Sequence, residues 1–222
     1  MCSSDLTFPA FPGDQLDPRL TGGDLCIQAC ADDPQVAEHA VRTLVRIARG
    51  TAVLAWSQTG FNRPATGATT PRNLFGFKDG TANLRTADDL NQFVWVSAAD
   101  GPAWMVGGTY LAARKIYMVI ENWDDQTLAT QQGVFGRTKQ TGAPLSGGDE
   151  RTRPDFRALG ANGQPLIPVD SHVALAAPPR NNGQRILRRG YNFVEGADAQ
   201  GREQAGLFFI AFARNQIGRA HV

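Results

Sequence analysis

Residues 74–85 read Leu-Phe-Gly-Phe-Lys-Asp-Gly-Thr-Ala-Asn-Leu-Arg, and the interpretation of the whole chain starts from them. They set one carboxylate, Asp79, between Gly76 and Gly80, and glycine permits tight turns and close approach of the backbone. The two phenylalanines before Asp79 supply apolar surface that we expect to wall its carboxylate. An ordinary Asp-Gly turn shows the same local pattern. The stretch alone therefore leaves open whether Asp79 is a turn residue or an acid–base group.

Two later segments add chemistry to this carboxylate. Residues 167–178 place His172 after Asp-Ser and before an apolar run, which suits an axial ligand of haem iron because the imidazole must be neutral and fixed. A hydrogen-bonded core histidine is the alternative. Residues 186–193 contain Arg188 and Arg189 before a glycine, and this turn can bring a permanent positive charge into the same pocket. A solvated basic turn is the alternative there.

With these three segments in this order, the chain resembles the dye-decolourising, or Dyp-type, haem peroxidases, specifically the exported branch also described as deferrochelatases. The Gly-x-x-Asp-Gly signature of that family appears as Gly76-Phe-Lys-Asp-Gly80. The other matching segments follow in the family's order: 104–110, 135–139, 141–145, 170–172, 187–191 and 206–211. The resemblance extends from about Asp24 to Arg214.

The resemblance implies a cofactor, haem b, and a role for each site residue. His172 would be the axial ligand of the haem iron. Asp79 would move a proton between the oxygens of hydrogen peroxide, and Arg188 would stabilise the charge that develops as the O–O bond breaks. Adjacent residues of an extended chain point to opposite faces, so only one of Arg188 and Arg189 can enter the pocket. Arg188 follows the apolar pair Ile186-Leu187, and the resemblance matches it to the family's distal arginine. The further cofactor-binding residues that we expect are Asn83, Arg137, Phe208 and Phe209.

The function implied by the resemblance is reduction of hydrogen peroxide with oxidation of dyes or other small one-electron donors. A haem-binding component of an iron-uptake system, which extracts iron as a deferrochelatase, is the alternative. A haem enzyme of chlorite dismutase type is a third possibility, and the Asp79 signature argues against it. The resemblance further implies a periplasmic or exported parent protein, a homo-oligomer and partners in iron uptake.

Composition excludes some classes of partner. The chain has 22 basic and 21 acidic residues and a formal net charge of +1, so it carries no broad electrostatic footprint for nucleic acid. Charged side chains interrupt each apolar segment before the roughly 18–20 residues needed to span a bilayer. Cys26 and Cys30 would lie about 13 Å apart on one face of a strand, too far for a disulfide. We expect both thiols to be small core hydrophobes.

The predicted fold class is α+β, with ferredoxin-like subdomains and antiparallel sheets of the dimeric α+β barrel type, truncated at both ends. Apolar alternation predicts strands at 24–31, 51–57, 108–121 and 207–213. Helical periodicity predicts helices at 34–49 and 124–135, the second capped by Asp124 or Asp125. The segment between them and the last strand, 136–182, is expected to be irregular and to carry His172 as a functional excursion.

The predicted organisation has two parts. Residues 7–107 are expected to hold the C-terminal part of a first ferredoxin-like subdomain with the Asp79 loop. Residues 108–216 are expected to form a second subdomain with the haem-ligand loop. Residues 1–6 and 217–222 resemble translated sequencing-adaptor DNA, so we exclude them from fold reasoning and expect an internal fragment of a longer protein.

Overall fold

The computed structural model describes residues 11–65 and 67–215 and divides into two compact units. The smaller unit covers Ala10–Thr59, and the larger unit runs from Gly60 onward. The adaptor-like ends, 1–6 and 217–222, lie outside the described residues. A domain boundary near residue 107 stays a prediction, whereas the Asp79 loop belongs to the same unit as the strands that follow it.

The smaller unit contains the short 3-10 helix η1 (Pro18–Leu20) and the helix α1 (Pro34–Ile47), which confirms the helix predicted near 34–49. Helix α1 begins there because the side chain of Asp33 accepts a hydrogen bond from the Gln35 amide and Pro34 occupies the first turn. No described residue of this unit is buried.

The strands predicted on either side of α1 are wrong. Residues 24–31 and 51–57 are extended but pair with no strand in the part of the chain that the structure describes. An extended run becomes a strand only when a partner supplies ladder hydrogen bonds. The side chain of Trp56 instead donates to the carbonyl of Gly22, which precedes the first run. Cys26 and Cys30 are exposed, so the expectation that they are core residues is also wrong.

The larger unit is organised by an antiparallel sheet with the long strand β4 (Glu203–Ala213) at its centre. Strand β1 (Tyr110–Met118) pairs with one edge of β4, and β2 (Leu187–Arg188) and β3 (Tyr191–Ala197) pair with the other. The strands predicted at 108–121 and 207–213 are confirmed. An antiparallel sheet with accompanying helices confirms the α+β class.

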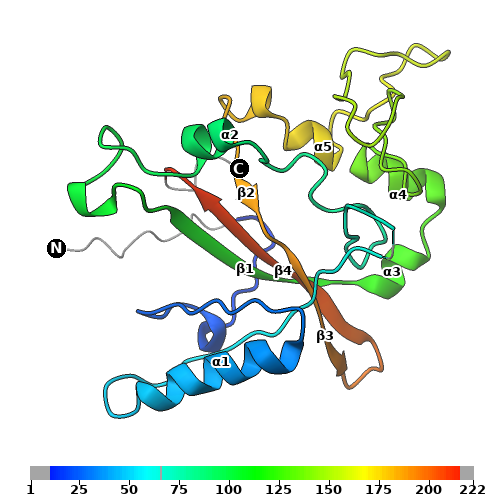
Figure 1. Cartoon of the computed structure of the whole chain (residues 1–222). Coiled ribbons are helices and arrows are strands. Elements are labelled where there is room, and N and C mark those ends of the chain that lie inside the picture. The colour runs from blue at the N-terminus through cyan, green and yellow to red at the C-terminus, as the bar shows by residue number, and fades with distance from the viewer. Residues whose placement is uncertain (1–10, 66, 216–222) are drawn as a thin grey trace. The chain divides into compact units, whose positions relative to one another are not determined.

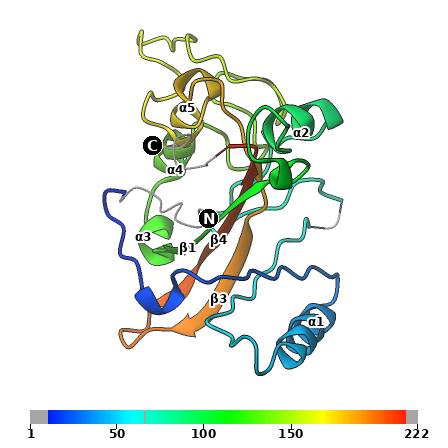
Figure 2. The ribbon, with the colours of Figure 1, turned by 90° about the vertical axis from the view of Figure 1, so that its left-hand side faces the viewer.

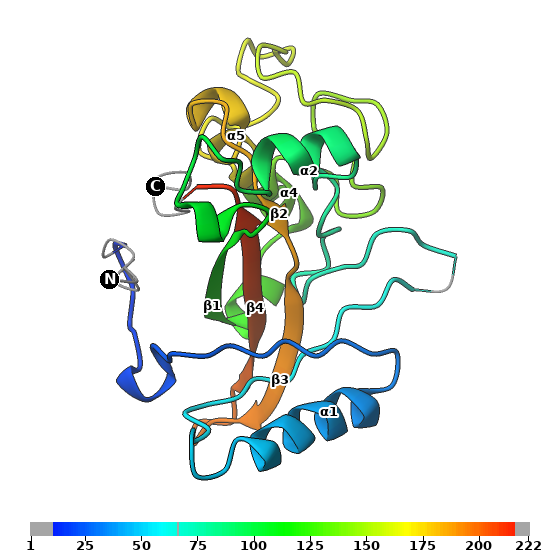
Figure 3. The same cartoon turned by 60° about the vertical axis from the view of Figure 1, so that its left-hand side comes forward.

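Strands β2 and β3 lie end to end along the same edge of β4. Leu187 pairs with Phe212 and Tyr191 with Phe208, so the register continues across the two residues that separate the strands. The Arg189 amide donates to the Ile210 carbonyl at 2.8 Å and carries the ladder through this gap. Figure 3 shows the two segments following one another beside β4, and Figure 2 shows β3 beside β4 from another side.

The two faces of this sheet differ in burial. Residues directly opposite on paired strands share a face, so Ala112, Ala211 and Arg188 lie on one side. The buried cluster of Ala112, Ile186, Ala211 and Ala213 lies there, with Phe209 packed against it. This face, which we call the Arg188 face, carries the core of the sheet.

Helices and loops surround the sheet of the larger unit. They are α2 (Ala87–Phe93), η2 (Ala103–Met105), α3 (Ile120–Asp124), α4 (Leu128–Phe135), α5 (His172–Leu175) and η3 (Pro178–Arg180). Figures 1 and 3 show α2, α4 and α5 gathered at the end of the sheet where β2 lies. The segment 136–182 is irregular apart from α5 and η3, as predicted. No helix in the described ranges is both long and apolar enough to cross a membrane.

The single helix predicted over 124–135 is in fact two, so the predicted cap is wrong. Asp124 ends α3, and the Asp125 amide still donates to the Glu121 carbonyl at 3.1 Å. Helix α4 begins after Thr127, whose hydroxyl accepts from the Thr130 amide. Gly136 ends α4 at a φ of 79°, a left-handed conformation that favours glycine.

Candidate active site

The Asp79 loop is a tight structure in which both flanking glycines are required. Gly76 and Gly80 have φ values of 81° and 104°, which side-chain-bearing residues rarely adopt. The Asp79 amide donates to the Pro71 carbonyl at 2.9 Å, and Arg72 and Lys78 form an isolated bridge across the turn. The glycines predicted to shape the chain around Asp79 are therefore confirmed in that role.

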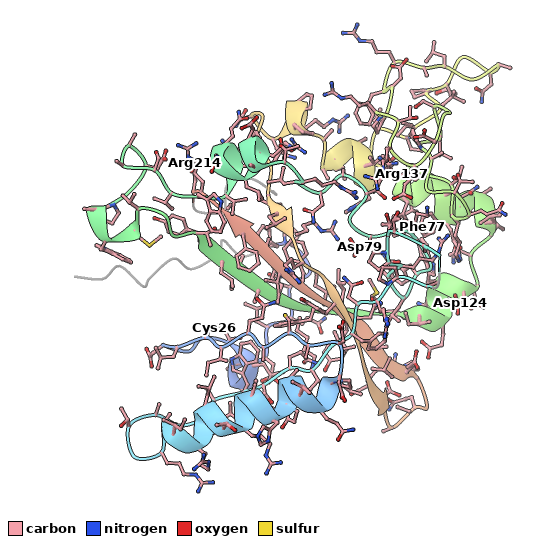
Figure 4. The ribbon with its side chains drawn as sticks, viewed as in Figure 1. Cys26, Phe77, Asp79, Asp124, Arg137 and Arg214 are labelled. Atoms are coloured by element: carbon pink, nitrogen blue, oxygen red, sulfur yellow. The ribbon has the colours of Figure 1, made fainter. Side chains whose placement is uncertain are left out.

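The two phenylalanines expected to wall Asp79 pack elsewhere, so that expectation is wrong. Phe77 is only 2% exposed and stacks on Phe135 with 3.9 Å between ring centroids. Phe75 stacks on Trp123 at 4.4 Å, and the four rings form one aromatic cluster. Aromatic rings gain more from packing on one another than from lining a polar group. Figure 4 labels Phe77 and Asp79 on the same loop.

The structure brings Arg188 to Asp79. Arg188 Nη2 lies 2.5 Å from Asp79 Oδ1, and both side chains are largely shielded from solvent, at 27% and 12% exposed. The guanidinium carbon lies 5.5 Å from the centre of the Phe209 ring on the same face of the sheet. Arg188 Nε is buried and has no hydrogen-bond partner in the described part of the chain. The pair therefore retains one donor that a bound group can use.

Asn83 fixes the backbone of Arg188. Its side-chain oxygen accepts from the Arg188 amide at 2.9 Å, and its nitrogen donates to the Arg188 carbonyl at 2.8 Å. We call these two hydrogen bonds the Asn83 clasp. Asn83 follows Asp79 by four residues, so one short motif supplies both the carboxylate and the amide that holds its arginine partner. Sequence reasoning selected Asn83 as a haem contact, and this clasp is a role that it missed.

Arg189 and Phe208 point away from the Asp79–Arg188 pair. Arg189 is exposed and donates to the Tyr191 hydroxyl at 3.2 Å. Phe208 pairs with Tyr191 across the sheet, whereas Phe209 shares the Arg188 face. Neighbours on a strand point to opposite faces, and binding of the cofactor by Phe208 and Phe209 stays a prediction.

A cavity of about 410 Å³ opens at the ion pair. Its lining residues include one acidic residue, Asp79, and three arginines, Arg85, Arg188 and Arg189. Asn83 and Gly190 also line it. A Cβ on Gly190 would lie 3.5 Å from Asp79 Oδ2, an ordinary contact, but only 3.0 Å from Leu207 Cδ1, which would have to shift.

His172 lies outside the lining of this cavity, at the start of α5, and is exposed. Its ring centroid lies 5.8 Å from that of Phe135, and Phe135 stacks on Phe77 two residues before Asp79. The aromatic cluster therefore links the imidazole to the Asp79 loop. The other described histidine, His39, lies exposed on α1 in the smaller unit.

Arg137 supports a loop rather than the cavity. Its Nη1 donates to the carbonyls of Gly142 at 2.7 Å and of Glu150 at 3.0 Å. Burial lowers the pKa of Arg137, against the opposing effect of the nearby Glu150 charge. Figure 4 shows Arg137 close to α4. Its contact with haem stays a prediction.

Sequence reasoning missed Glu150 completely. Its carboxylate accepts hydrogen bonds from Lys78, from Thr70 at 2.5 Å and from Thr81 at 3.2 Å. Burial alone would raise the pKa of Glu150, but the hydrogen bonds from Lys78 and Thr70 outweigh it and hold the pKa below its usual value. These partners lie 69 to 80 residues away in sequence, so no local pattern reveals them.

Comparison with known proteins identifies the family. The C-terminal model of the Dyp-type peroxidases matches residues 70–220, and the N-terminal model matches residues 6–62. A dye-decolorizing peroxidase of Thermobifida fusca (strain YX) is 41% identical over 211 residues, which cover 92% of this chain and 49% of that protein. A deferrochelatase of Escherichia coli (strain K12) is 39% identical and is covered to 49%. The chain thus spans about half the length of these curated relatives.

Solved structures agree with this assignment. An oxyferrous complex of DtpA from Streptomyces lividans superposes with a TM-score of 0.90 at 35% identity over 96% of this chain and 59% of that one. A DyP-type peroxidase from Cellulomonas bogoriensis gives a TM-score of 0.87 at 36% identity, with coverage of 96% and 59%. The fold, the sequence and the order of the motifs agree, and the chain belongs to the Dyp-type peroxidase family.

Proposed function

We propose that the protein containing this chain is a haem-dependent peroxidase that reduces hydrogen peroxide and oxidises dyes or other small one-electron donors. One observation carries the proposal: the ion pair between Asp79 and Arg188 at a cavity of about 410 Å³. It presents a carboxylate and a guanidinium to a small bound molecule, and the family assignment supplies the reaction class.

The residues present fit a haem group, which we propose to be haem b. Within the described ranges, no three His, Cys, Asp or Glu side chains gather to hold a metal ion. A single imidazole can hold iron when a macrocycle provides the other ligands, and His172, exposed at the start of α5, is the histidine that we propose for that role. The buried, unpaired Nε of Arg188 offers a donor on the Asp79 side. When bound, the haem would supply a redox-active iron that can give electrons to hydrogen peroxide and regain them one at a time from the donors.

The chain's own residues would manage protons and charge. Asp79 would take the proton from the inner oxygen of hydrogen peroxide and return it to the outer oxygen, so that water can leave. Arg188 would stabilise the negative charge that develops on the departing oxygen. The clasp by Asn83 would keep that guanidinium at hydrogen-bonding distance from Asp79.

The test is reconstitution of the full chain with hemin, followed by its Soret spectrum before and after addition of peroxide. Asp79→Asn should keep hemin bound and slow the reaction with peroxide by about 10²-fold or more, the contribution of a positioned acid–base group. Asp89→Asn is the matched control, because Asp89 also pairs with an arginine, Arg185, at 2.8 Å but does not line the cavity. An Asp79→Asn protein that reacts like the wild type would contradict the proposal.

A second candidate function is extraction of iron from haem. The deferrochelatase relatives favour it, since they are 39% identical over 91% of this chain. Release of iron from bound haem in the absence of peroxide, at a rate unaffected by Asp79→Asn, would support this function over peroxidase turnover. An exported parent protein, homo-oligomerisation and iron-uptake partners belong to the same proposal and rest on the resemblance to the family.

A further inference from the structure

Glu150 binds the Asp79 loop on both sides of Asp79. Its Oε2 accepts from Lys78, the residue before Asp79, and its Oε1 accepts from Thr81, two residues after it. Oε1 also accepts from the Thr70 hydroxyl at 2.5 Å, and Thr70 is 4% exposed. Both oxygens of one carboxylate are thus used to hold the loop at three points.

The backbone of Glu150 is itself anchored. Arg137 donates to the Glu150 carbonyl at 3.0 Å from a position directly after α4. The same Nη1 donates to the Gly142 carbonyl, so Arg137 connects three points in the first third of the long loop 136–182. Glu150 therefore presents its carboxylate from a fixed support.

The Asp79 loop needs such a support because of its glycines. Gly76 and Gly80 lie on either side of Asp79, and glycine loses more conformational freedom on ordering than any other residue. A loop with two glycines so close together opens readily unless side-chain hydrogen bonds hold it in one conformation. The bonds to Glu150 lie within this segment, at Lys78 and Thr81, whereas Asp79 itself is left to pair with Arg188.

From this geometry we infer that Glu150 is a positioning residue, which holds Asp79 at the distance where it meets Arg188 and a bound peroxide. Glu150 does not line the cavity and does not contact the ion pair, so it acts through the residues beside Asp79. The inference rests on the proposed function for the role of Asp79. In this view a second carboxylate, that of Glu150, supports Asp79, and it comes from the same loop, 136–182, that carries His172.

The test measures loop order directly, by hydrogen exchange and mass spectrometry on the full chain without added cofactor. Glu150→Gln removes the charge that holds Lys78 and should speed exchange about tenfold in the peptide covering residues 70–85, where the Asp79 amide is bonded to Pro71. Lys78→Met removes the same ion pair from the other side and should loosen the same peptide.

Glu195→Gln is the matched control. Glu195 also accepts from a partly buried lysine, Lys115, at 2.6 Å and from the Tyr117 hydroxyl at 3.0 Å, but it lies on β3. Its loss should speed exchange in the β1 and β3 peptides and leave residues 70–85 unchanged. Exchange in residues 70–85 that stays at the wild-type rate in Glu150→Gln would overturn the inference. Equally faster exchange throughout the sheet would overturn it too, because Glu150 would then be a general structural residue.

A second readout separates this inference from the proposed function. In hemin-loaded protein, Glu150→Gln should slow the reaction with peroxide about tenfold while hemin affinity stays within twofold. Local loosening without any change in that rate would uphold the positioning role and would contradict the proposed role of Asp79 instead.

Discussion

The clasp between Asn83 and Arg188 allows a prediction whose size follows from the structure. Asn83→Ala removes two hydrogen bonds, of 2.8 and 2.9 Å, and leaves an amide and a carbonyl of Arg188 without these partners in a partly buried place. Each hydrogen bond of this kind contributes about 1 kcal/mol net, and an unsatisfied buried group costs more. We expect the free energy of unfolding to fall by about 2–3 kcal/mol.

The assay is urea unfolding of the full chain, followed by circular dichroism. Asn181→Ala is the matched control. Asn181 is also buried and makes two bonds to backbone carbonyls, but these are longer, at 3.3 and 3.4 Å, and lie away from the cavity. It should cost about 1 kcal/mol. A loss below about 0.5 kcal/mol in Asn83→Ala, with an unchanged urea slope, would refute the idea that this clasp holds β2 to the Asp79 loop.

The clasp also has a functional consequence. Asn83→Asp keeps an acceptor for the Arg188 amide but turns a carboxylate oxygen toward the Arg188 carbonyl. We expect it to disturb the position of the guanidinium and to slow the peroxide reaction of hemin-loaded protein more than it weakens hemin binding. Hemin affinity that falls in step with the rate would mean that Asn83 acts on the cofactor, as the sequence first suggested.

Three further predictions concern separate groups. Arg188→Leu should slow the stopped-flow reaction with peroxide by about 10² to 10³, whereas Arg189→Leu, on the opposite face, should change it little, and the reverse order would exchange their roles. His172→Ala should abolish the Soret spectrum of histidine-ligated hemin, while alanine at the exposed histidine of α1 should preserve it; retention in the first variant would place the ligand elsewhere. Hydrogen bonds from Arg214 and Ser97 hold the pKa of Asp100 at about 2. The ionised carboxylate therefore stabilises the fold at pH values above the ordinary pKa of aspartate, and this stabilisation is lost as the pH falls toward 2. The melting temperatures of wild type and Asp100→Asn should therefore differ at neutral pH and converge between about pH 4 and pH 2, and a constant gap would contradict this.

Part of the fold follows from local sequence. Residues 207–213 form the centre of the sheet because Leu-Phe-Phe-Ile is apolar and prefers strands, and α1 begins where Asp33 and Pro34 predict. Strand patterns at 24–31 and 51–57 failed because pairing depends on a partner strand, which local sequence does not specify. The helix expected over 124–135 divides before Thr127, because Asp124 ends α3 and the Thr127 hydroxyl caps α4.

The sequence by itself determined the family and the glycines around Asp79, because both depend on residue type and order. It also predicted a role beside Asp79 for Arg188, and the structure pairs these two side chains. Only the tertiary structure decided what holds these groups in place. Asn83 reaches Arg188 across 105 residues, and Glu150 reaches Lys78 across 72, so neither contact leaves a local pattern. Hydrogen bonds between distant segments arise from the path of the backbone, and that path is set by the packing of the whole sheet.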